Sequence, residues 1–319
     1  GATPDDLHLD YIKSVYLPSV VGREVFEADQ RDIKSQMASV RLYDRTHDCP
    51  TNAAIILFGK DPRYYMPGAY VQFVRFAGNS IGGDVLNEKR FTGPLFQLLP
   101  ELETFVDNAI ITQRPVAASL FREKTIINYP NNALRELMMN ACMHRDYQSN
   151  MPIRLYQFDD HIEIMNAGGL YGEARPENFP LVNDYRNPII AEGMKEMQYV
   201  NMFNQGIRRV QGMLRENGNQ DAIFDVSKIT AFDVKVMASL EYVGNSKGTN
   251  GQQVTERQYT IIQSVLSNPT ISYKTLAKKL GVTRQTIYTE FKKLQEMDIL
   301  IGEGNTSSRV WTVKSIENV

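Results

Sequence analysis

Three polar side chains at helical spacing interrupt an otherwise apolar segment in the middle of this 319-residue chain. In the run ALRELMMNACMHRDY, residues 133–147, Glu136, Asn140 and His144 stand four residues apart. Side chains at this spacing share one face of a helix. A carboxylate there can orient an attacking water as a general base, and an amide oxygen can ligate the Mg²⁺ that bridges phosphate groups. The pattern therefore suits a nucleotide site bordered by one helix.

A structural role is the alternative for the same three residues. Glu136 would then pair with an arginine such as Arg154, and Asn140 would cap a neighbouring backbone segment. His144 would be a structural histidine near the helix end. Cys142 and the methionines around it are expected to pack in the core.

The elements that must position these residues follow from periodicity and turn signals. The helix is expected to start after Pro130, with Asn131 or Asn132 as N-cap. A hairpin is expected next, with strands Ile153–Phe158 and His161–Met165 joined by Asp159-Asp160. Residues 187–200 and 206–218 predict two helices, and 232–243 a closing strand.

The N-terminal part predicts a mixture of helices and strands. The expected elements are a helix Leu9–Leu17, an amphipathic helix Glu24–Leu42, a buried strand Ala53–Phe58, an alternating strand over 69–78 and a helix over 93–110 with Pro94 in its first turn. The segment 244–253, GNSKGTNGQQ, has no apolar anchor and predicts a linker. The expected division is an N-terminal α/β region at 1–120, a second domain at 121–243, the linker, and a third domain at 254–319.

The third domain has the pattern of a winged helix-turn-helix. Thr255 and Gln258 form a capping box for a first helix. A second helix, Ser272–Leu280, ends at Gly281. Thr283 caps a third helix, and a two-stranded wing follows with Gly302 and Gly304 in its turn. The core stripe of the third helix is Ile287, Phe291 and Leu294.

The opposite side of this third helix could contact bases or phosphates in the major groove of duplex DNA. Its expected DNA-binding residues are Arg284, Gln285, Tyr288, Thr289 and Lys292. The charge agrees with this, because residues 252–319 carry nine Lys and Arg against six acids, or +3, while the remainder carries 26 against 31, or −5. Dimerisation or protein docking is the alternative use of such a domain.

Composition narrows the class of protein. Hydrophobic residues make up 42% and charged residues 23% of the sequence, as in ordinary globular proteins. We expect no membrane span, because the sequence has no apolar run of about 18 residues. Two cysteines and no visible secretory signal favour the reducing cytoplasm. Oligomeric state stays open, with a homo-oligomer among the alternatives.

Several motifs together resemble a known group of proteins. ELMMNACMH resembles the E-x-x-x-N-A-x-x-H box of the GHKL ATPases, and IEIMNAGGL resembles their adenine-side box. TNAAIILFGKDP, ALRELMMNACMHRDY, IEIMNAGGLYG and NQGIRRV, in this order, resemble the RecG-like, divergent AlbA-associated ATP-binding transcriptional regulators. The resemblance implies an α+β fold, with a GHKL-like α/β sandwich followed by a winged helix-turn-helix. We find no AlbA-like segment, so the chain is expected to begin after such a domain.

The resemblance also implies roles for individual residues, with ATP and Mg²⁺ as cofactors. Glu136 matches the water-activating glutamate, Asn140 the magnesium ligand, and His144 the end of the box. Asn166 stands where GHKL enzymes have the aspartate that accepts a hydrogen bond from the adenine amino group.

Three glycines extend this correspondence. Gly168 and Gly169 would let the backbone approach a base. The family's G-x-G-I turn reads Asn204-Gln205-Gly206-Ile207, so its first glycine is absent, and Arg208 and Arg209 are candidate phosphate partners.

Two functions follow, from different classes. The first is a DNA-binding transcriptional regulator whose core binds a nucleotide, or is a degenerate scaffold, and transmits to the winged helix. The second is an ATP-hydrolysing enzyme of DNA metabolism, without the P-loop of a motor helicase. Asn166 and Asn204 favour the regulator, and Glu136 favours the enzyme. A pure assembly scaffold is a third, weaker reading.

Overall fold

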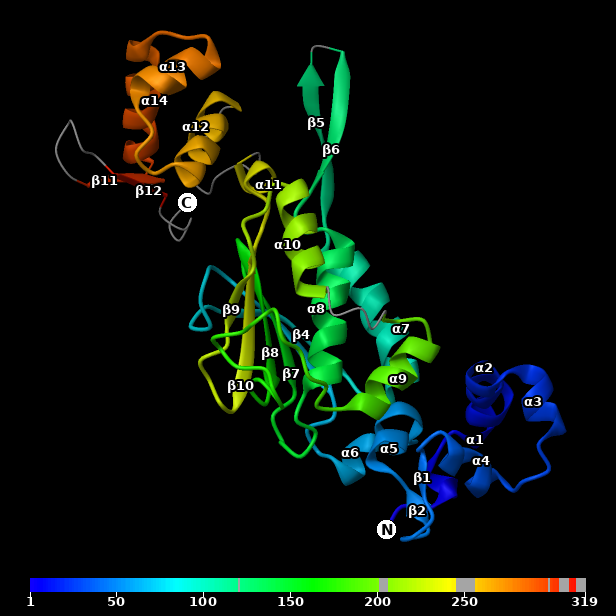
Figure 1. Ribbon diagram of the computed structural model, residues 1–319. Coiled ribbons are helices and arrows are strands. Elements are labelled where there is room, and N and C mark those ends of the chain that lie inside the picture. The colour runs from blue at the N-terminus through cyan, green and yellow to red at the C-terminus, as the bar shows by residue number, and fades with distance from the viewer. Residues whose placement is uncertain (120, 201–205, 245–255, 298, 304–309, 314–319) are drawn as a thin grey trace.

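A six-stranded mixed sheet forms the centre of the computed structural model (Figure 1). The structure describes residues 1–119, 121–200, 206–244, 256–297, 299–303 and 310–313. In sheet order the strands are β4 (Val85–Phe91), β3 (Val71–Phe76), β7 (Ile153–Gln157), β8 (His161–Ala167), β10 (Ala231–Met237) and β9 (Ile223–Asp225). Strands β3 and β7 are parallel, and all other neighbours are antiparallel.

The expected β7–β8 hairpin and closing strand are confirmed. The amide of Phe158 donates to the carbonyl of His161 across Asp159-Asp160, at 2.9 Å, so the turn has two residues. Strand β10 pairs with β8 over its full length, from Ala231 opposite Ala167 to Met237 opposite His161. This register places the end of β8, with its Asn-Ala-Gly-Gly sequence, beside the start of β10.

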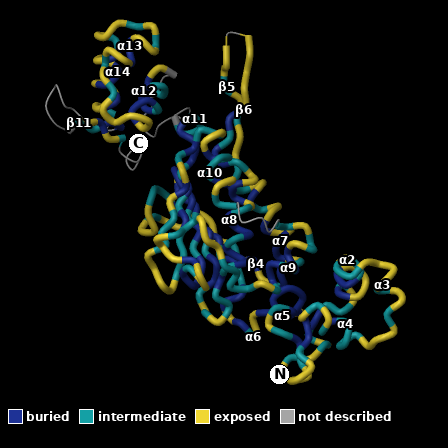
Figure 2. Tube along the Cα trace, in the orientation of Figure 1, coloured by how far each residue is buried: buried dark blue, intermediate teal, exposed yellow. Residues whose placement is uncertain are grey.

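Four helices cover one face of the sheet (Figure 1). They are α7 (Leu95–Phe105), α8 (Asn131–His144), α9 (Pro188–Glu196) and α10 (Gly206–Glu216). Helix α8 contacts α9, α10 and strand β8, and its residues Leu137, Met138 and Cys142 are buried in the core. The buried residues in Figure 2 concentrate in this part of the molecule. The α/β sandwich expected from the sequence is therefore confirmed.

The start of α8 differs from the expectation. Pro130 is the N-cap and the helix has no side-chain cap, so neither Asn131 nor Asn132 caps it. The Asn131 amide instead donates to Asp107 Oδ1, at 2.9 Å. Pro94 likewise lies at the N-cap of α7 rather than in its first turn. Proline has no N–H to lose at these positions, so it can stand at a helix boundary.

Two N-terminal expectations were wrong. Residues Ala53–Phe58 lie in a helix, α5 (Asn52–Phe58), whose N-cap Thr51 accepts from the Ala54 amide at 3.3 Å. A short apolar run cannot by itself distinguish a buried strand from a buried helix. The expected helix Glu24–Leu42 is broken into α3 (Arg23–Ala28) and α4 (Ile33–Ser39).

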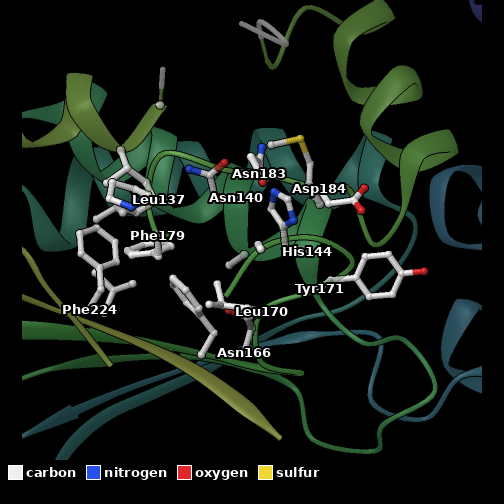
Figure 3. A pocket seen from close by; sticks show the side chains of 18 of the residues that line it. Leu137, Asn140, His144, Asn166, Leu170, Tyr171, Phe179, Asn183, Asp184 and Phe224 are labelled. Carbon is white, nitrogen blue, oxygen red and sulfur yellow. The ribbon is translucent and has the colours of Figure 1, made fainter. Parts of the chain in front are cut away.

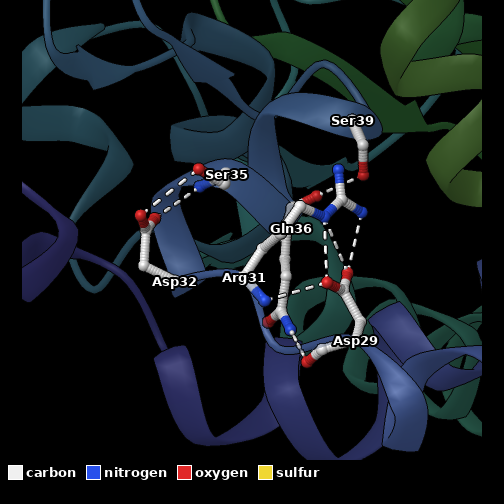
Figure 4. A network of polar contacts seen from close by, with 6 residues as sticks. All are labelled: Asp29, Arg31, Asp32, Ser35, Gln36 and Ser39. Carbon is white, nitrogen blue, oxygen red and sulfur yellow. Dashed lines mark hydrogen bonds and ion pairs between the residues drawn. The ribbon is translucent and has the colours of Figure 1, made fainter.

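Local polar contacts cause this break between α3 and α4 (Figure 4). Asp29 is extended and accepts from the Arg31 guanidinium, at 2.7 Å, while Asp32 caps α4 through the Ser35 amide, also at 2.7 Å. These competing side-chain bonds end one helix and start the next. The first expected helix is longer than predicted, and runs through α1 (Leu9–Tyr11), a π-helical turn (Ile12–Tyr16) and α2 (Leu17–Val21).

The expected boundary at residue 120 divides elements that belong together. It falls between β5 (Gln113–Ser119) and β6 (Arg122–Ile127), which form a hairpin that the sequence analysis missed. Strands β3 and β4, on the N-terminal side, share the central sheet with β7. The region 1–120 therefore contributes strands to the second domain's sheet instead of standing alone. Small N-terminal elements complete it: β1 (Tyr43–Asp44), β2 (Cys49–Pro50) and α6 (Pro62–Tyr65).

The C-terminal unit follows α11 (Leu240–Gly244) and has the expected order of elements. It comprises α12 (Glu256–Ser267), α13 (Tyr273–Leu280), α14 (Arg284–Glu296), β11 (Leu300–Glu303) and β12 (Val310–Val313). Ser272 and Thr283 cap α13 and α14, and Gly281 ends α13 in a left-handed conformation at φ +65°. The predicted linker residues 245–253, Thr255 and Gly304 lie outside the described residues.

Candidate functional site

One pocket brings together every residue that the sequence assigned to a nucleotide site. It lies between α8, the end of β8, the segment after β8 and the first turn of α10 (Figure 3). The predicted residues that line it are Glu136, Asn140, His144, Asn166, Gly168, Gly169 and Gly206. They come from four segments that are separated by up to 70 residues. The fold, and not sequence proximity, therefore assembles this cluster.

Glu136 and Asn140 face the start of α10. A Cβ built on Gly206 would collide with Oε1 of Glu136 and would lie 3.4 Å from Nδ2 of Asn140. Both side chains are half-buried. The expected alternative, a pair between Glu136 and Arg154, is absent from the described residues, because Arg154 lies on β7 with Nη1 3.9 Å from Met165 Sδ. Glu136 therefore directs its carboxylate toward the pocket.

His144 lies on the same face, further along α8. Its ring stacks on Tyr185 with centroids 5.4 Å apart and an interplanar angle of 16°. Burial, with the positive charge of Arg186, lowers the pKa of His144 to about 4, although Asp184 opposes the shift. The imidazole is therefore neutral at pH 7 and can donate or accept a hydrogen bond through its ring nitrogens.

Asn166 and the two glycines form the wall at the end of β8. Asn166 is only 3% exposed, and its Nδ2 donates to the Ala167 carbonyl at 3.3 Å. The amides of Gly168 and Gly169 donate to the carbonyls of Thr230 and Ile229, at 2.8 and 2.9 Å. These glycines thus serve close packing against the chain itself, in addition to lining the pocket.

Gly168 has a specific steric requirement. Its φ is +87°, a conformation that favours glycine. A Cβ there would lie 3.0 Å from Cβ of Asp146 and 3.1 Å from the Arg186 guanidinium. Arg186 is held in place, because its Nη2 donates to the Gly169 carbonyl at 3.2 Å and its guanidinium lies over the Tyr171 ring.

The sequence analysis missed the apolar end of the pocket. Phe179, Phe224 and Phe232 form a cluster with ring centroids 5.5 to 6.1 Å apart. Phe179 lies in the irregular segment between β8 and α9, where no periodicity identifies inward-facing residues. Phe232 could have been found, because it alternates with the buried Val234 along β10. Further lining residues from the same irregular segment are Leu170, Tyr171, Ala174, Pro180, Val182, Asn183, Asp184 and Tyr185.

The pocket is therefore divided by chemistry. Phenylalanine rings and aliphatic side chains form one end, while Glu136, Asn140, His144 and Arg208 supply polar and charged groups elsewhere on its wall. Arg208 is exposed and lines the pocket; the equally exposed Arg209 does not. Such a site suits a ligand with a flat apolar part and a polar or charged part.

The winged helix presents the second predicted set of residues on one surface. Arg284, Gln285, Tyr288, Thr289 and Lys292 are all exposed on α14. The opposite side of the helix is the expected core stripe, since Ile287, Phe291 and Leu294 are fully buried. Lys292 lies 3.8 Å from Glu296, an exposed pair that leaves the lysine accessible.

Comparisons with known proteins identify both domains. Residues 150–236 match the family described as "Putative ATP-dependent DNA helicase recG C-terminal", and residues 257–305 match the "HTH domain" family. The chain carries a recG C-terminal-like ATPase-type domain followed by an HTH domain, as the sequence resemblance predicted. The first match includes Asn166, Gly168, Gly169 and Gly206 but starts after α8. The second includes all five predicted residues of α14.

The fold also has a solved counterpart. The crystal structure of the DIP2311 protein from Corynebacterium diphtheriae is similar, with a TM-score of 0.56 and 18% sequence identity. The similarity covers 99% of this chain and 63% of the DIP2311 chain, so this chain spans less than two thirds of that protein. No curated protein matches the sequence. Among the described residues, no helix has the length and apolarity needed to span a bilayer.

Proposed function

We propose that this protein is a DNA-binding transcriptional regulator whose GHKL-like domain binds ATP in the pocket beside α8. The observation that supports it is the convergence of the seven predicted residues on one pocket with an apolar and a polar part. Duplex DNA is the partner proposed for the exposed face of α14. Under this proposal the pocket controls the DNA affinity of the winged helix.

The pocket's own residues suggest how ATP would lie. The phenylalanine cluster offers faces for a purine, and the Asn166 amide is a buried polar group that can recognise it. The first turn of α10 and Arg208 provide positive potential for phosphates. The neutral His144 adds a hydrogen-bonding group at the same wall.

Magnesium fits this arrangement with ligands from outside the protein. The Asn140 amide oxygen is the protein ligand, while the described residues contain no cluster of three or more His, Cys, Asp or Glu that could hold an ion alone. A bound Mg²⁺ would neutralise phosphate charge and would complete its coordination with phosphate oxygens and water. Asn140 would thus hold the ion, and the open space beside Gly206 would admit the phosphates.

Helix α10 offers a route from the pocket to the winged helix. Its first residue lines the pocket, and its residues Val210 and Leu214 are fully buried in the core. Just after its end, a Cβ on Gly218 would lie 3.5 Å from the hydroxyl of Tyr259, on α12. A shift of α10 on ligand binding would therefore reach the first helix of the winged helix.

The test is the DNA affinity of the full chain with and without Mg²⁺-ATP. Fluorescence anisotropy of labelled duplex DNA should give different dissociation constants in the two conditions for the wild type. Asn140→Ala should bind DNA as the wild type does without ATP and should not respond to it. Identical affinities with and without ATP in the wild type would contradict the regulatory proposal.

An ATP-hydrolysing enzyme is the second candidate, because Glu136 has the position of a general base. Phosphate release under multiple-turnover conditions distinguishes it. If hydrolysis is the function, Glu136→Gln should lower the rate by about 10² to 10⁴ while ATP binding stays nearly unchanged. ATP binding without phosphate release would leave the regulator.

A further inference from the structure

A two-stranded arm projects from the body beside the winged helix (Figure 1). It consists of β5 and β6, and most of its residues are exposed (Figure 2). Phe121, between the two strands, is 92% exposed. An isolated hairpin is at best marginally stable in water, and a large exposed aromatic at its end contributes nothing to that stability. The arm therefore has the form of an interaction element.

The base of the arm rests on α11. Lys124 Nζ lies 2.5 Å from Glu241 Oε1, and the Arg114 guanidinium lies 4.4 Å from the Tyr242 ring. Helix α11 also contacts α12, and its first residue, Leu240, packs in the hydrophobic core of the winged helix. The arm and the winged helix therefore share one support.

The strands of the arm are poorly suited to pairing with another strand. Pro115 has no N–H, and the register shifts between Ala117 and Ser119. Proline and bulges are devices that prevent edge-to-edge association of sheets. A second copy of the chain adding a strand to this arm is therefore disfavoured.

The charge of the arm instead complements phosphate groups. Its residues 113–127 include Arg114, Arg122 and Lys124 against a single acid, Glu123. Residues 113–127 thus carry +2, while the chain without them and without residues 252–319 carries 23 Lys and Arg against 30 acids, or −7. Arg122 is exposed and forms no ion pair with any described residue. It stands next to the exposed Phe121.

We infer that this arm is a second contact with duplex DNA, separate from α14. Arg122 would bind a phosphate, and Phe121 would pack into the adjacent groove as an apolar wedge. The inference rests on the DNA binding proposed for the chain and does not depend on ATP. Since the arm and the winged helix share α11, one duplex can engage both.

The experiment compares full-length variants by anisotropy with mixed-sequence duplex DNA over a range of salt concentrations. Phe121→Ala with Arg122→Ala should lower the affinity by at least about eightfold at about 0.1 M salt and reduce the log–log salt slope by about 0.9, the effect of one phosphate contact. Arg122→Lys should keep the slope. The matched control is Arg75→Ala with Ile81→Ala, which removes an equally exposed cation and aliphatic side chain on the β3–β4 hairpin. It should bind as the wild type does.

Sedimentation velocity and the α14 variant Arg284→Ala with Lys292→Ala separate the other outcomes. If the α14 variant loses affinity and the arm variant does not, the inference is overturned while the winged helix keeps its role. An arm variant with unchanged DNA affinity but a changed sedimentation coefficient would make the arm a self-association surface. A wild type that binds no duplex would overturn both the arm and the winged-helix contacts.

Discussion

The carboxylate of Glu136 lies against the first residue of α10, Gly206, in a space that no side chain at Gly206 could share. The two residues are 70 positions apart, and the contact joins the helix with the general-base position to the helix that would receive phosphates. A carboxylate at a helix N-terminus is stabilised by the helix dipole. A phosphate bound at the same end would compete with that carboxylate, so ligand binding and the position of Glu136 should be linked.

The first prediction tests this contact with one methyl group. Gly206→Ala should displace Glu136 and lower ATP affinity by about tenfold or more, or ~1.4 kcal/mol. Gly212→Ala is the matched control on the same helix, because a Cβ at Gly212 meets no atom within 4 Å. The control should keep ATP affinity and gain about 0.5–1 kcal/mol in stability. Calorimetric titration measures affinity, and equal affinities for the two variants would contradict the predicted contact.

The second prediction concerns stability against pH. The pKa of His144 is about 4 in the folded protein, below its ordinary value of 6.5, because burial and Arg186 disfavour the charged ring. The unfolded chain therefore takes up this proton first, and the free energy of unfolding should fall as pH drops from 6.5 to 4. The slope approaches about 1.4 kcal/mol per pH unit, for a total near 3 kcal/mol.

Urea unfolding at several pH values isolates this effect through a variant. His144→Gln should flatten the stability curve between pH 6.5 and 4. His161 has the opposite sign: burial lowers its pKa, but hydrogen bonds to Asp160 and Glu163 raise it further, so its contribution is present at low pH and lost as pH rises. A curve of equal slope in the wild type and His144→Gln would show that His144 is not buried as described.

The third prediction concerns the end of α8. Asn187 Nδ2 donates to the carbonyls of Met143 and Arg145, at 2.9 and 2.7 Å, and so ties the irregular segment to the helix that carries the site. Asn187→Ala should lower the free energy of unfolding by about 1–3 kcal/mol, since it leaves carbonyls unpaired. Asn178→Ala, whose Nδ2 bonds only the Glu173 carbonyl in an exposed turn, is the control and should cost less. Thermal unfolding of both variants provides the comparison.

The fourth prediction concerns the winged helix. Arg284→Ala with Lys292→Ala should weaken DNA binding at low salt and reduce the log–log salt slope by about 1.8 if each contacts one phosphate. Lys13→Ala with Arg23→Ala removes the same charge from exposed N-terminal positions and should change affinity little. Unchanged affinity of the α14 variant in a salt titration would favour a docking role for the domain.

How much of this was available from the sequence depends on the kind of signal. Glu136, Asn140 and His144 were placed correctly because helical spacing fixes a face, and the β7–β8 hairpin because its turn residues are distinctive. The winged helix was predicted well because its caps, Ser272 and Thr283, and its αL glycine, Gly281, are local features.

Other features depend on tertiary context. The run Ala53–Phe58 is apolar at every position, so its helix follows from packing and from the Thr51 cap. Phe179 and the rest of the irregular segment have no periodicity that marks them as pocket residues. Strand β4 was missed because most of it is exposed, and the β5–β6 arm because it alternates weakly and carries Pro115.

The most direct test of the central claim is a thermal-shift titration of the full chain with ATP and Mg²⁺. The wild type should show a rise in its unfolding temperature that saturates with ATP concentration, because a ligand that binds only the folded state stabilises it. Asn140→Ala should lose that rise, whereas Glu136→Gln should keep it. A wild type with no shift at millimolar ATP would contradict nucleotide binding and leave the pocket without its proposed ligand.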